Sequence, residues 1–411
     1  MNRYLLVFIF ILQAITSSAQ NFDEYFEDNT MRIDYAFAGN NQQQSIYLKG
    51  LFKKDEWAGR KARLAEEFLS GNGQLRVFDH ASGKLIYVHT FSTLFTEWLL
   101  EEEATRVSKS FDASYNIPFP KKPVDVKITL TNNHRKVVAE LNHTIDPKDI
   151  LIRKLGDNGT PYKYIIRNGS ITDCIDLAIV AEGYTADEMD KFYKDCDRAC
   201  DALFTHEPFT TLKKKFNVVA VAPVSLQSGP SVPHDGTWTN TALGTHFDTF
   251  YSQRYLTTPN DQKLNDILSG VPFEHIIVLV NTGLYGGGGI FNEWLTCSTD
   301  HPTFNKVLVH EFGHSFAGLA DEYAYGEQVD PPYPADTEPW EPNITTKKDF
   351  DSKWKDMMGK DGVGLFEGAG YMKTGCFRPV DNCRMKVNEV KDFCPVCTRA
   401  IIRITDFYTA K

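Results

Sequence analysis

Apolar and polar residues alternate with a period of two through much of the chain between residues 31 and 148, as expected for half-buried β-strands. Residues 75–91 alternate on both sides of the turn Ala81-Ser82-Gly83-Lys84, and residues 124–141 do so around Asn132-Asn133-His134. Two such hairpins, further short apolar runs and no long helical pattern predict an N-terminal β-sandwich over residues 20–148. This segment carries no obvious chemical constellation, so it either supports the structure and presents substrate or binds carbohydrate or protein.

From residue 174 the pattern changes to alternating strands and helices. The expected strands are 175–180, 216–221 and 276–280, and the expected helices are 186–204 and a shorter one around 264–268. Thr185 and Glu188 have the spacing of a capping box at the start of the first helix. This order predicts an α/β region, with a mainly parallel sheet and helices packed on it, in a second domain over residues 149–411. The overall fold class is therefore α+β or α/β.

A metal-site motif follows the last predicted strand. His310 and His314 are four residues apart, so on a helix they lie on one face and can bind the same ion. Glu311 follows the first histidine, as the general base does in the H-E-x-x-H motif. In that motif the base takes a proton from a water whose pKa zinc has lowered to about 7. Gly318 can end the helix in a left-handed turn.

A catalytic zinc needs a third protein ligand besides an open position. Asp321 and Glu322 both follow the glycine turn at a suitable place. The motif alone leaves both acids as candidates.

The run HEFGHSFAGLADEY resembles the bacterial IgA-metallopeptidase family, whose members are metzincin-like zinc peptidases. The stretch GYTADE at 183–188 and the residues Cys-Phe-Arg-Pro and Asn-Cys-Arg-Met at 376–379 and 382–385 resemble the same family. In the metzincin pattern the glycine and the third ligand follow the second histidine by three and six residues, whereas here they follow by four and seven. One extra residue before the turn explains both offsets.

The resemblance implies a catalytic domain with an active-site helix and one catalytic Zn²⁺. It also implies that Asp321 is the third ligand, with Glu322 as the competitor. A methionine should lie beneath the zinc, and the resemblance favours Met385 over Met372. Either methionine could instead be an ordinary core residue.

Other residues are candidates for binding substrate or stabilising the transition state. Four glycines at 286–289 precede the motif, and in the resembled clan an edge strand above the zinc pairs with extended substrate. We therefore expect residues 285–292, with Gly287 and Gly288 at their centre, to form this edge or its loop. Tyr323 and Tyr371 are candidate donors to the oxyanion, although both could simply be packed tyrosines. A proline-rich loop at 331–342 is expected to wall the cleft.

All eight cysteines lie after residue 170. An even number of cysteines in an exported chain favours disulfides, which we expect here. The alternative is a structural zinc at four of them, because two have the C-x-x-C spacing of zinc ligands. These four are Cys376, Cys383, Cys394 and Cys397.

Residues 1–19 have the pattern of a signal peptide: Arg3, an apolar core, and small residues before a cleavage site after Ala19. The protein is thus expected to be exported to the periplasm or secreted, with no membrane span in the mature chain. The formal net charge of −10 argues against a nucleic-acid partner.

Together these features predict a secreted zinc metalloendopeptidase. Its substrate would be a protein or peptide, with immunoglobulin or another host or mucosal protein among the candidates that the resemblance suggests. The alternatives are a zinc hydrolase of a non-peptide amide bond, which would share every residue named, and a non-catalytic glycan- or protein-binding protein on the same fold.

Overall fold

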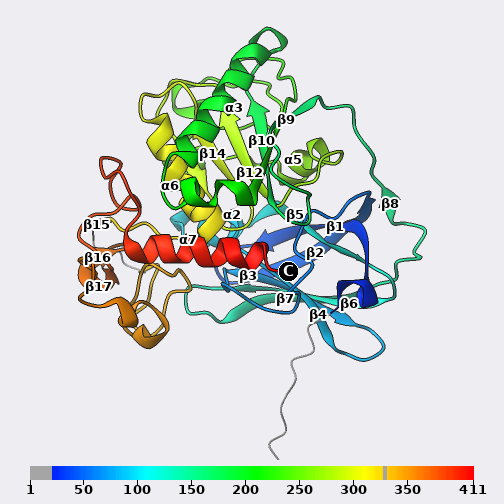
Figure 1. The fold of residues 1–411 in the computed structure, drawn as a ribbon, viewed down its shortest axis with the longest axis horizontal. Coiled ribbons are helices and arrows are strands. Elements are labelled where there is room, and N and C mark those ends of the chain that lie inside the picture. The colour runs from blue at the N-terminus through cyan, green and yellow to red at the C-terminus, as the bar shows by residue number, and fades with distance from the viewer. Residues whose placement is uncertain (1–20, 327–330) are drawn as a thin grey trace, which may run out of the picture.

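The computed structural model describes residues 21–326 and 331–411, and it has a mixed α/β fold with several sheets (Figure 1). The predicted signal peptide lies outside the described residues. None of the helices within these ranges is long and apolar enough to cross a membrane.

The N-terminal region is built from two four-stranded sheets. One has the strand order β5-β1-β2-β8 and the other has the order β4-β3-β6-β7. Their strands are β1 (Phe26–Gly39), β2 (Gln44–Lys54), β3 (Gly73–Asp79), β4 (Leu85–Phe91), β5 (Lys109–Pro120), β6 (Val124–Thr131), β7 (Val137–Ile145) and β8 (Arg153–Lys154), with the short helices α1 (Phe22–Tyr25) and α2 (Leu94–Trp98). Both predicted hairpins are present, as the antiparallel pairs β3–β4 and β6–β7.

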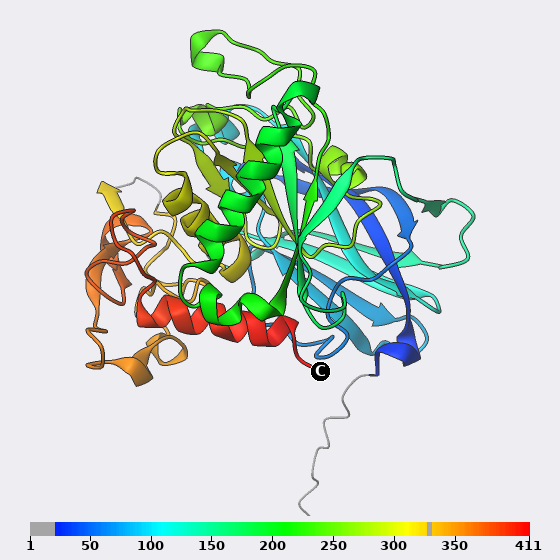
Figure 2. The same cartoon turned by 45° about the horizontal axis from the view of Figure 1, so that its top comes forward.

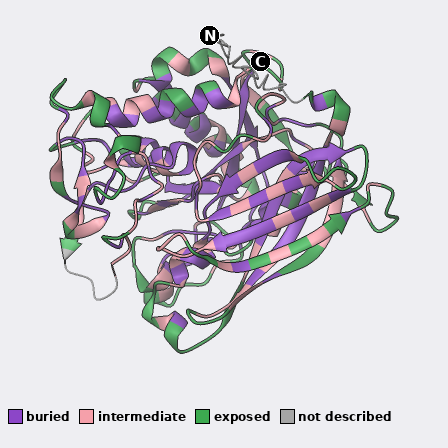
Figure 3. Cartoon of the chain, turned by 90° about the horizontal axis from the view of Figure 1, so that it is seen from below, coloured by how far each residue is buried: buried purple, intermediate pink, exposed green. Residues whose placement is uncertain are grey.

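The two sheets share one hydrophobic core, because one face of each sheet packs against the other sheet. Ile33 and Tyr35 of β1 and Leu75 and Val77 of β3 are all fully buried in this core. Figure 3 shows buried residues alternating with less buried ones along several strands. The period of two in the sequence thus corresponds to one buried face on each sheet.

The second region contains a six-stranded sheet of order β13-β14-β12-β10-β11-β9. The four central strands run parallel, and the edge strands β13 and β9 are antiparallel to their neighbours. The strands are β9 (Tyr162–Ile166), β10 (Ile175–Glu182), β11 (Phe216–Val221), β12 (His275–Val280), β13 (Gly287–Gly289) and β14 (Trp294–Ser298). The helices of this region are α3 (Met189–Phe204), α4 (Phe209–Leu212), α5 (Asp261–Ile267) and α6 (Phe304–Ala317).

Both faces of this sheet are covered, which explains why its four central strands are buried at every position and mainly apolar. Leu177 and Ile179 of β10 belong to the core that α3 and α6 cover, whereas Ala178 and Val180 belong to the core on the opposite face, with α5. The predicted capping box is present, because the Thr185 N–H donates to Glu188 Oε2 at 2.8 Å. It opens a short 3₁₀ turn that leads into α3.

The C-terminal part consists of a small sheet and a final helix. The sheet has the order β15-β17-β16, from β15 (Ala324–Gly326), β16 (Phe366–Ala369) and β17 (Tyr371–Arg378). The final helix α7 (Pro395–Tyr408) shares the core of α6, and Figure 2 shows the orange segment gathered beside the start of α7. Between β15 and β16 the chain forms two separate 3₁₀ turns, Phe350–Ser352 and Lys355–Met357.

The two regions are joined by polar contacts, among them an ion pair of the buried Arg32. Arg32 pairs with Asp34 within β1 and with Asp266 at the end of α5, both at 2.7 Å. A backbone hydrogen bond also joins the regions: the Ser92 N–H donates to the Phe291 carbonyl at 2.9 Å. These contacts fix the N-terminal sheets against the sheet that carries the metal-site helix.

The glycine that ends α6 allows a test of how closely the chain is packed at this turn. Gly318 ends α6 with φ +59°, and an added Cβ would lie 2.6 Å from Trp340. Gly236 ends a 3₁₀ turn with φ +71° and has nothing within 4 Å of that position. We expect Gly236→Ala to cost about 1–2 kcal/mol of unfolding free energy from the left-handed backbone alone. Gly318→Ala should cost about 1–3 kcal/mol more, from overpacking.

Urea unfolding followed by circular dichroism checks both variants. Equal losses for Gly318→Ala and Gly236→Ala would show that the contact with Trp340 relaxes without cost.

Candidate metal centre

Helix α6 presents the three residues of the predicted motif. His310 and His314 lie one turn apart on the same face, with Glu311 next to the first. Gly318 then takes the left-handed conformation, and its N–H donates to the His314 carbonyl at 3.0 Å. This turn carries Asp321 back toward the two histidines.

Three potential ligand atoms converge at this point. His310 Nε2 lies 3.0 Å from His314 Nε2 and 3.0 Å from Asp321 Oδ1, and His314 Nε2 lies 3.3 Å from the same oxygen. The structure thus brings together the two histidines and the acid that the resemblance implied as third ligand.

The other ring nitrogen of each histidine faces a main-chain carbonyl. Nδ1 of His310 lies 3.0 Å from the Arg384 carbonyl, and Nδ1 of His314 lies 2.5 Å from the Leu319 carbonyl. A carbonyl only accepts, so in a neutral imidazole the proton is on Nδ1 and the Nε2 lone pair is free for a metal.

Asp321 shows that this cluster suits a cation. Its Oδ1 is buried and has no hydrogen-bond partner, although it points at both histidines. Burial alone would raise the pKa of Asp321, but the positive charges of His314 and His310 hold it well below its usual range. Burial alone would lower the pKa of His314, but Asp321 raises it to about 9. Two nitrogens and one carboxylate oxygen form a donor set typical of zinc.

Glu311 lies beneath the glycine strand β13. A Cβ at Gly287 would lie 3.1 Å from Glu311 Oε1, so this glycine leaves room for the carboxylate. Burial raises the pKa of Glu311, and the charges on His310 and His314 only partly oppose this shift. A carboxylate with a raised pKa next to the metal site suits a general base.

Tyr371 contacts the metal site through Asp321. Its hydroxyl donates to Asp321 Oδ2, the oxygen that faces away from the histidines. Tyr371 has φ +65°, a strained conformation for a residue with a side chain, and its ring lies 5.5 Å from that of Tyr323. Tyr371 therefore contacts the candidate ligand Asp321 directly, and the Tyr323 ring packs against the Tyr371 ring.

Glu322, the competing third ligand, points into a different cluster. It is fully buried, accepts a hydrogen bond from Asn343 Nδ2 at 3.0 Å, and lies near three cysteines. Those cysteines are Cys383, Cys394 and Cys397. Geometry therefore separates the two adjacent acids, with Asp321 at the histidines and Glu322 at the sulfurs.

The structure does not support the predicted disulfides, because all eight cysteines are free and buried. The alternative four-cysteine zinc site is not formed either. Cys376 packs in a separate small core with Ala320, Ile344 and Ala369, and Glu322 takes the fourth place in the cysteine cluster. Spacing alone could not reveal a carboxylate about sixty residues earlier in the sequence as the partner of these thiols.

The two candidate methionines lie in different surroundings. Met385 is fully buried against α6, where a Cβ on Gly313 would meet its sulfur at 2.8 Å. Its carbonyl accepts a hydrogen bond from the Glu322 N–H at 2.8 Å. Met372 lies instead on β17, in register with Ala369. The position beneath the helix that bears the histidines thus belongs to Met385.

The glycine segment forms an edge strand, as predicted for residues 285–292. Strand β13 pairs with β14 on one side, and on its other side Gly287 is bonded to a loop. The Gly287 N–H donates to the Arg254 carbonyl, and the Leu256 N–H donates to the Gly287 carbonyl, both at 3.4 Å. A Cβ on Gly288 would meet the Tyr255 ring at 2.6 Å. Part of the expected substrate edge is thus already covered.

That loop contains site residues that sequence reasoning missed. The Arg254 guanidinium contacts the Tyr325 hydroxyl, and its charge acts to lower the pKa of Glu311. The Tyr255 hydroxyl donates to Glu97 Oε2 at 2.5 Å. Burial raises the pKa of Glu97 to about 7. No motif marks these residues, and Glu97 comes from the N-terminal region, so no signal in the sequence connects them to the site.

The N-terminal region also contacts the proline-rich loop. Trp340 Nε1 donates to Asn72 Oδ1 at 2.9 Å, and Asn133 Nδ2 donates to the Pro331 carbonyl at 3.2 Å. The proline-rich loop therefore rests on turns of the N-terminal region.

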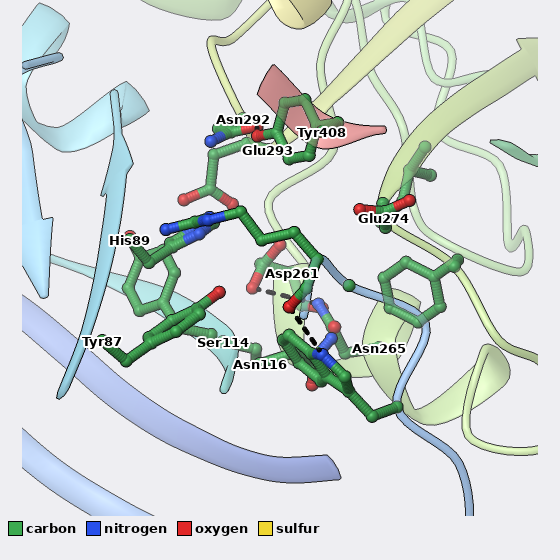
Figure 4. Close-up of a pocket in the computed structure, with 16 residues that line it drawn as sticks. Tyr87, His89, Ser114, Asn116, Asp261, Asn265, Glu274, Asn292, Glu293 and Tyr408 are labelled. Carbon is green, nitrogen blue, oxygen red and sulfur yellow. Dashed lines mark hydrogen bonds between the residues drawn. The ribbon is translucent and has the colours of Figure 1, made fainter. Parts of the chain in front are cut away.

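A separate cavity of about 70 Å³ lies between the two regions (Figure 4). Tyr87 and His89 line it from β4, Asp261 lines it from α5, and Glu293 lines it from the turn between β13 and β14. Burial raises the pKa of Asp261 and lowers that of His89 to about 3, so it disfavours the charged form of both side chains. None of the candidate metal-site residues lines this cavity. We interpret it as a gap in the packing between the two regions.

Comparison with known proteins agrees with this geometry. No match was found among curated proteins. The family profile described as "IgA Peptidase M64" matches residues 164–362 and 360–405, more than half of the chain, and the profile "Peptidase M64 N-terminus" matches residues 21–142. The matched ranges include the metal-site helix, Asp321 and the cysteine cluster, and the chain belongs to the IgA peptidase M64 family.

Proposed function

We propose that the protein is an exported zinc-dependent endopeptidase whose active site is the cluster of His310, His314 and Asp321. The observation that carries this proposal is the convergence of two Nε2 atoms on a buried carboxylate oxygen that has no hydrogen-bond partner. Membership of a peptidase family supports a peptide bond, rather than another amide, as the bond that is hydrolysed. An intact set of metal-binding groups argues against a purely binding role.

The residues of the site divide the chemistry among them. His310, His314 and Asp321 would hold the zinc, which when bound acidifies a water and polarises the scissile carbonyl. Glu311 accepts the proton of the attacking water on its carboxylate and then donates it to the leaving amine. Tyr371 holds Asp321 in position by its hydrogen bond to Oδ2.

The surroundings suit an extended peptide chain. Strand β13 runs beside Glu311, and Gly289 lies so close to α6 that a Cβ there would meet the Glu311 carbonyl at 2.5 Å. The loop at 254–256 already covers the strand at Gly287. We therefore propose that substrate runs along the part of this edge that lies beyond Gly287. Immunoglobulin or another host or mucosal protein is the proposed substrate class, from the family name alone.

The role of Glu311 is tested with the isosteric variant Glu311→Gln. We expect zinc content to stay unchanged and kcat to fall by about 10²–10⁴-fold, because the amide cannot accept the proton. Zinc analysis and cleavage of a peptide library measure the two effects. Glu24→Gln, which changes an exposed residue of α1, is the matched control. A Glu311→Gln variant with near wild-type turnover would exclude Glu311 as the base.

The affinity of the metal-free protein for zinc should depend on pH. The pKa of His314 is raised to about 9, above the ordinary value of 6.5, so a proton competes with zinc throughout this range. The free zinc concentration for half-maximal activity should therefore fall by about tenfold for each unit of rising pH below 9, for one displaced proton. Activity assays in zinc buffers measure it. A half-saturating concentration that is independent of pH would contradict the pairing of His314 with Asp321.

The variant Tyr371→Phe distinguishes two possible roles of this tyrosine: positioning Asp321 and stabilising the oxyanion. If Tyr371 positions Asp321, the half-saturating zinc concentration should rise by about 10–100-fold. Tyr325→Phe is the control, because Tyr325 stacks on Tyr371 but its hydroxyl contacts Arg254 instead. A fall in kcat with unchanged zinc affinity would assign Tyr371 to the oxyanion instead.

A further inference from the structure

Behind the histidine site, a second group of ligand atoms converges from three separate segments. Glu322 follows the turn after α6, Cys383 precedes Met385, and Cys394 and Cys397 lie at the start of α7. One atom from each of the four residues lies within 4.8 Å of all the others, and all four residues are buried. This cluster is distinct from the histidine site, with which it shares no residue.

The spacing of the atoms matches a tetrahedral zinc. Zinc–sulfur bonds of about 2.3 Å place two thiolates of a tetrahedron about 3.8 Å apart. Cys383 Sγ and Cys397 Sγ are 3.8 Å apart, and Cys397 Sγ lies 3.3 Å from Glu322 Oε1. Cys394 and Cys397 also have the C-x-x-C spacing common in structural zinc sites.

The main chain around the sulfurs favours thiolates. The Cys394 N–H donates to Cys383 Sγ at 3.3 Å, and the Cys397 N–H donates to Cys394 Sγ at 3.4 Å. Cys394 is also the N-cap of α7, where the helix dipole stabilises negative charge. The thiolate is the form of cysteine that binds a metal.

Glu322 supplies an independent observation. Its side chain is fully buried, and its Oε2 has no hydrogen-bond partner. Burying a carboxylate oxygen without a partner is costly, and a cation at the centre of the cluster would remove that cost. A disulfide between any two of the cysteines would leave the third thiol and this oxygen unpaired.

We propose that Glu322, Cys383, Cys394 and Cys397 form a second, structural zinc site. With four protein ligands and no exposed side, the site has no open position for substrate. Its three thiolates and one carboxylate carry the same formal charge as a four-cysteine site, which is a common structural type.

The position of the site gives it a role in the fold. Glu322 is the neighbour of Asp321, and Cys383 is the neighbour of Arg384, whose carbonyl faces His310 Nδ1 at 3.0 Å. Zinc bound here would fasten both of these segments to the start of α7. It would thus stabilise the segments that carry Asp321 and the Arg384 carbonyl, without taking part in the reaction.

The test uses the full-length protein with His310→Ala and His314→Ala, which removes the first site. We expect this double variant to bind one zinc per chain, against two for the unmodified protein, by elemental analysis. Zinc X-ray absorption of the double variant should show three sulfurs at about 2.3 Å and one oxygen. Cobalt in place of zinc should give the sulfur-to-cobalt charge-transfer absorption in the near ultraviolet.

Cys397→Ser in the same background should lose this zinc, and Cys376→Ser is the matched control, because that buried cysteine lies outside the cluster. If Cys397→Ser does not fold, the absorption spectra of the double variant still decide the question. A double variant without zinc, with a mass showing two thiols oxidised to a disulfide, would overturn the proposal, and so would zinc bound only by nitrogen and oxygen. Because the histidine site is absent from this variant, neither outcome depends on the proposed peptidase mechanism.

Discussion

The structure around α6 depends on the burial of two adjacent carboxylates, Asp321 and Glu322. Both lie in the interior, where an unpaired negative charge is unfavourable. Asp321 faces two imidazoles, and Glu322 faces three thiols and an amide. The left-handed turn at Gly318 directs the chain so that each acid reaches its own cluster. The charge on His314 compensates Asp321, whereas at Glu322 a cation would supply the charge that the protein atoms alone do not.

The rest of the chain holds this turn in place from several directions. The parallel sheet supports α6 through the core that it shares with α3 and α7. The segment around Met385 lies beneath the helix, and its main chain bonds to both His310 and Glu322. The N-terminal region contacts two loops around the site, through Glu97 of α2 and through Asn72. The positions of the candidate metal ligands therefore depend on contacts throughout the fold.

The sequence predicted those features that depend on local spacing. The hairpins, the alternating strands and helices and the pair of histidines follow from periods of two and of about four, which the backbone geometry imposes. The choice between Asp321 and Glu322 could not be made locally, because neighbouring residues differ only in what tertiary packing places around them. The edge strand at Gly287 was predicted, but the loop at 254–256 that covers it has no motif. For the same reason, Glu97 could not be connected to a helix that lies two hundred residues later.

The most direct test of the central claim is an anomalous difference map, at the zinc absorption edge, from crystals of the mature protein with zinc. The account predicts a peak between His310, His314 and Asp321, about 2.0–2.1 Å from both Nε2 atoms. It also predicts a second peak among Glu322 and the three cysteines. Absence of the first peak, with the two imidazoles bonded to each other or to Asp321 alone, would contradict the assignment of this helix to a metal centre.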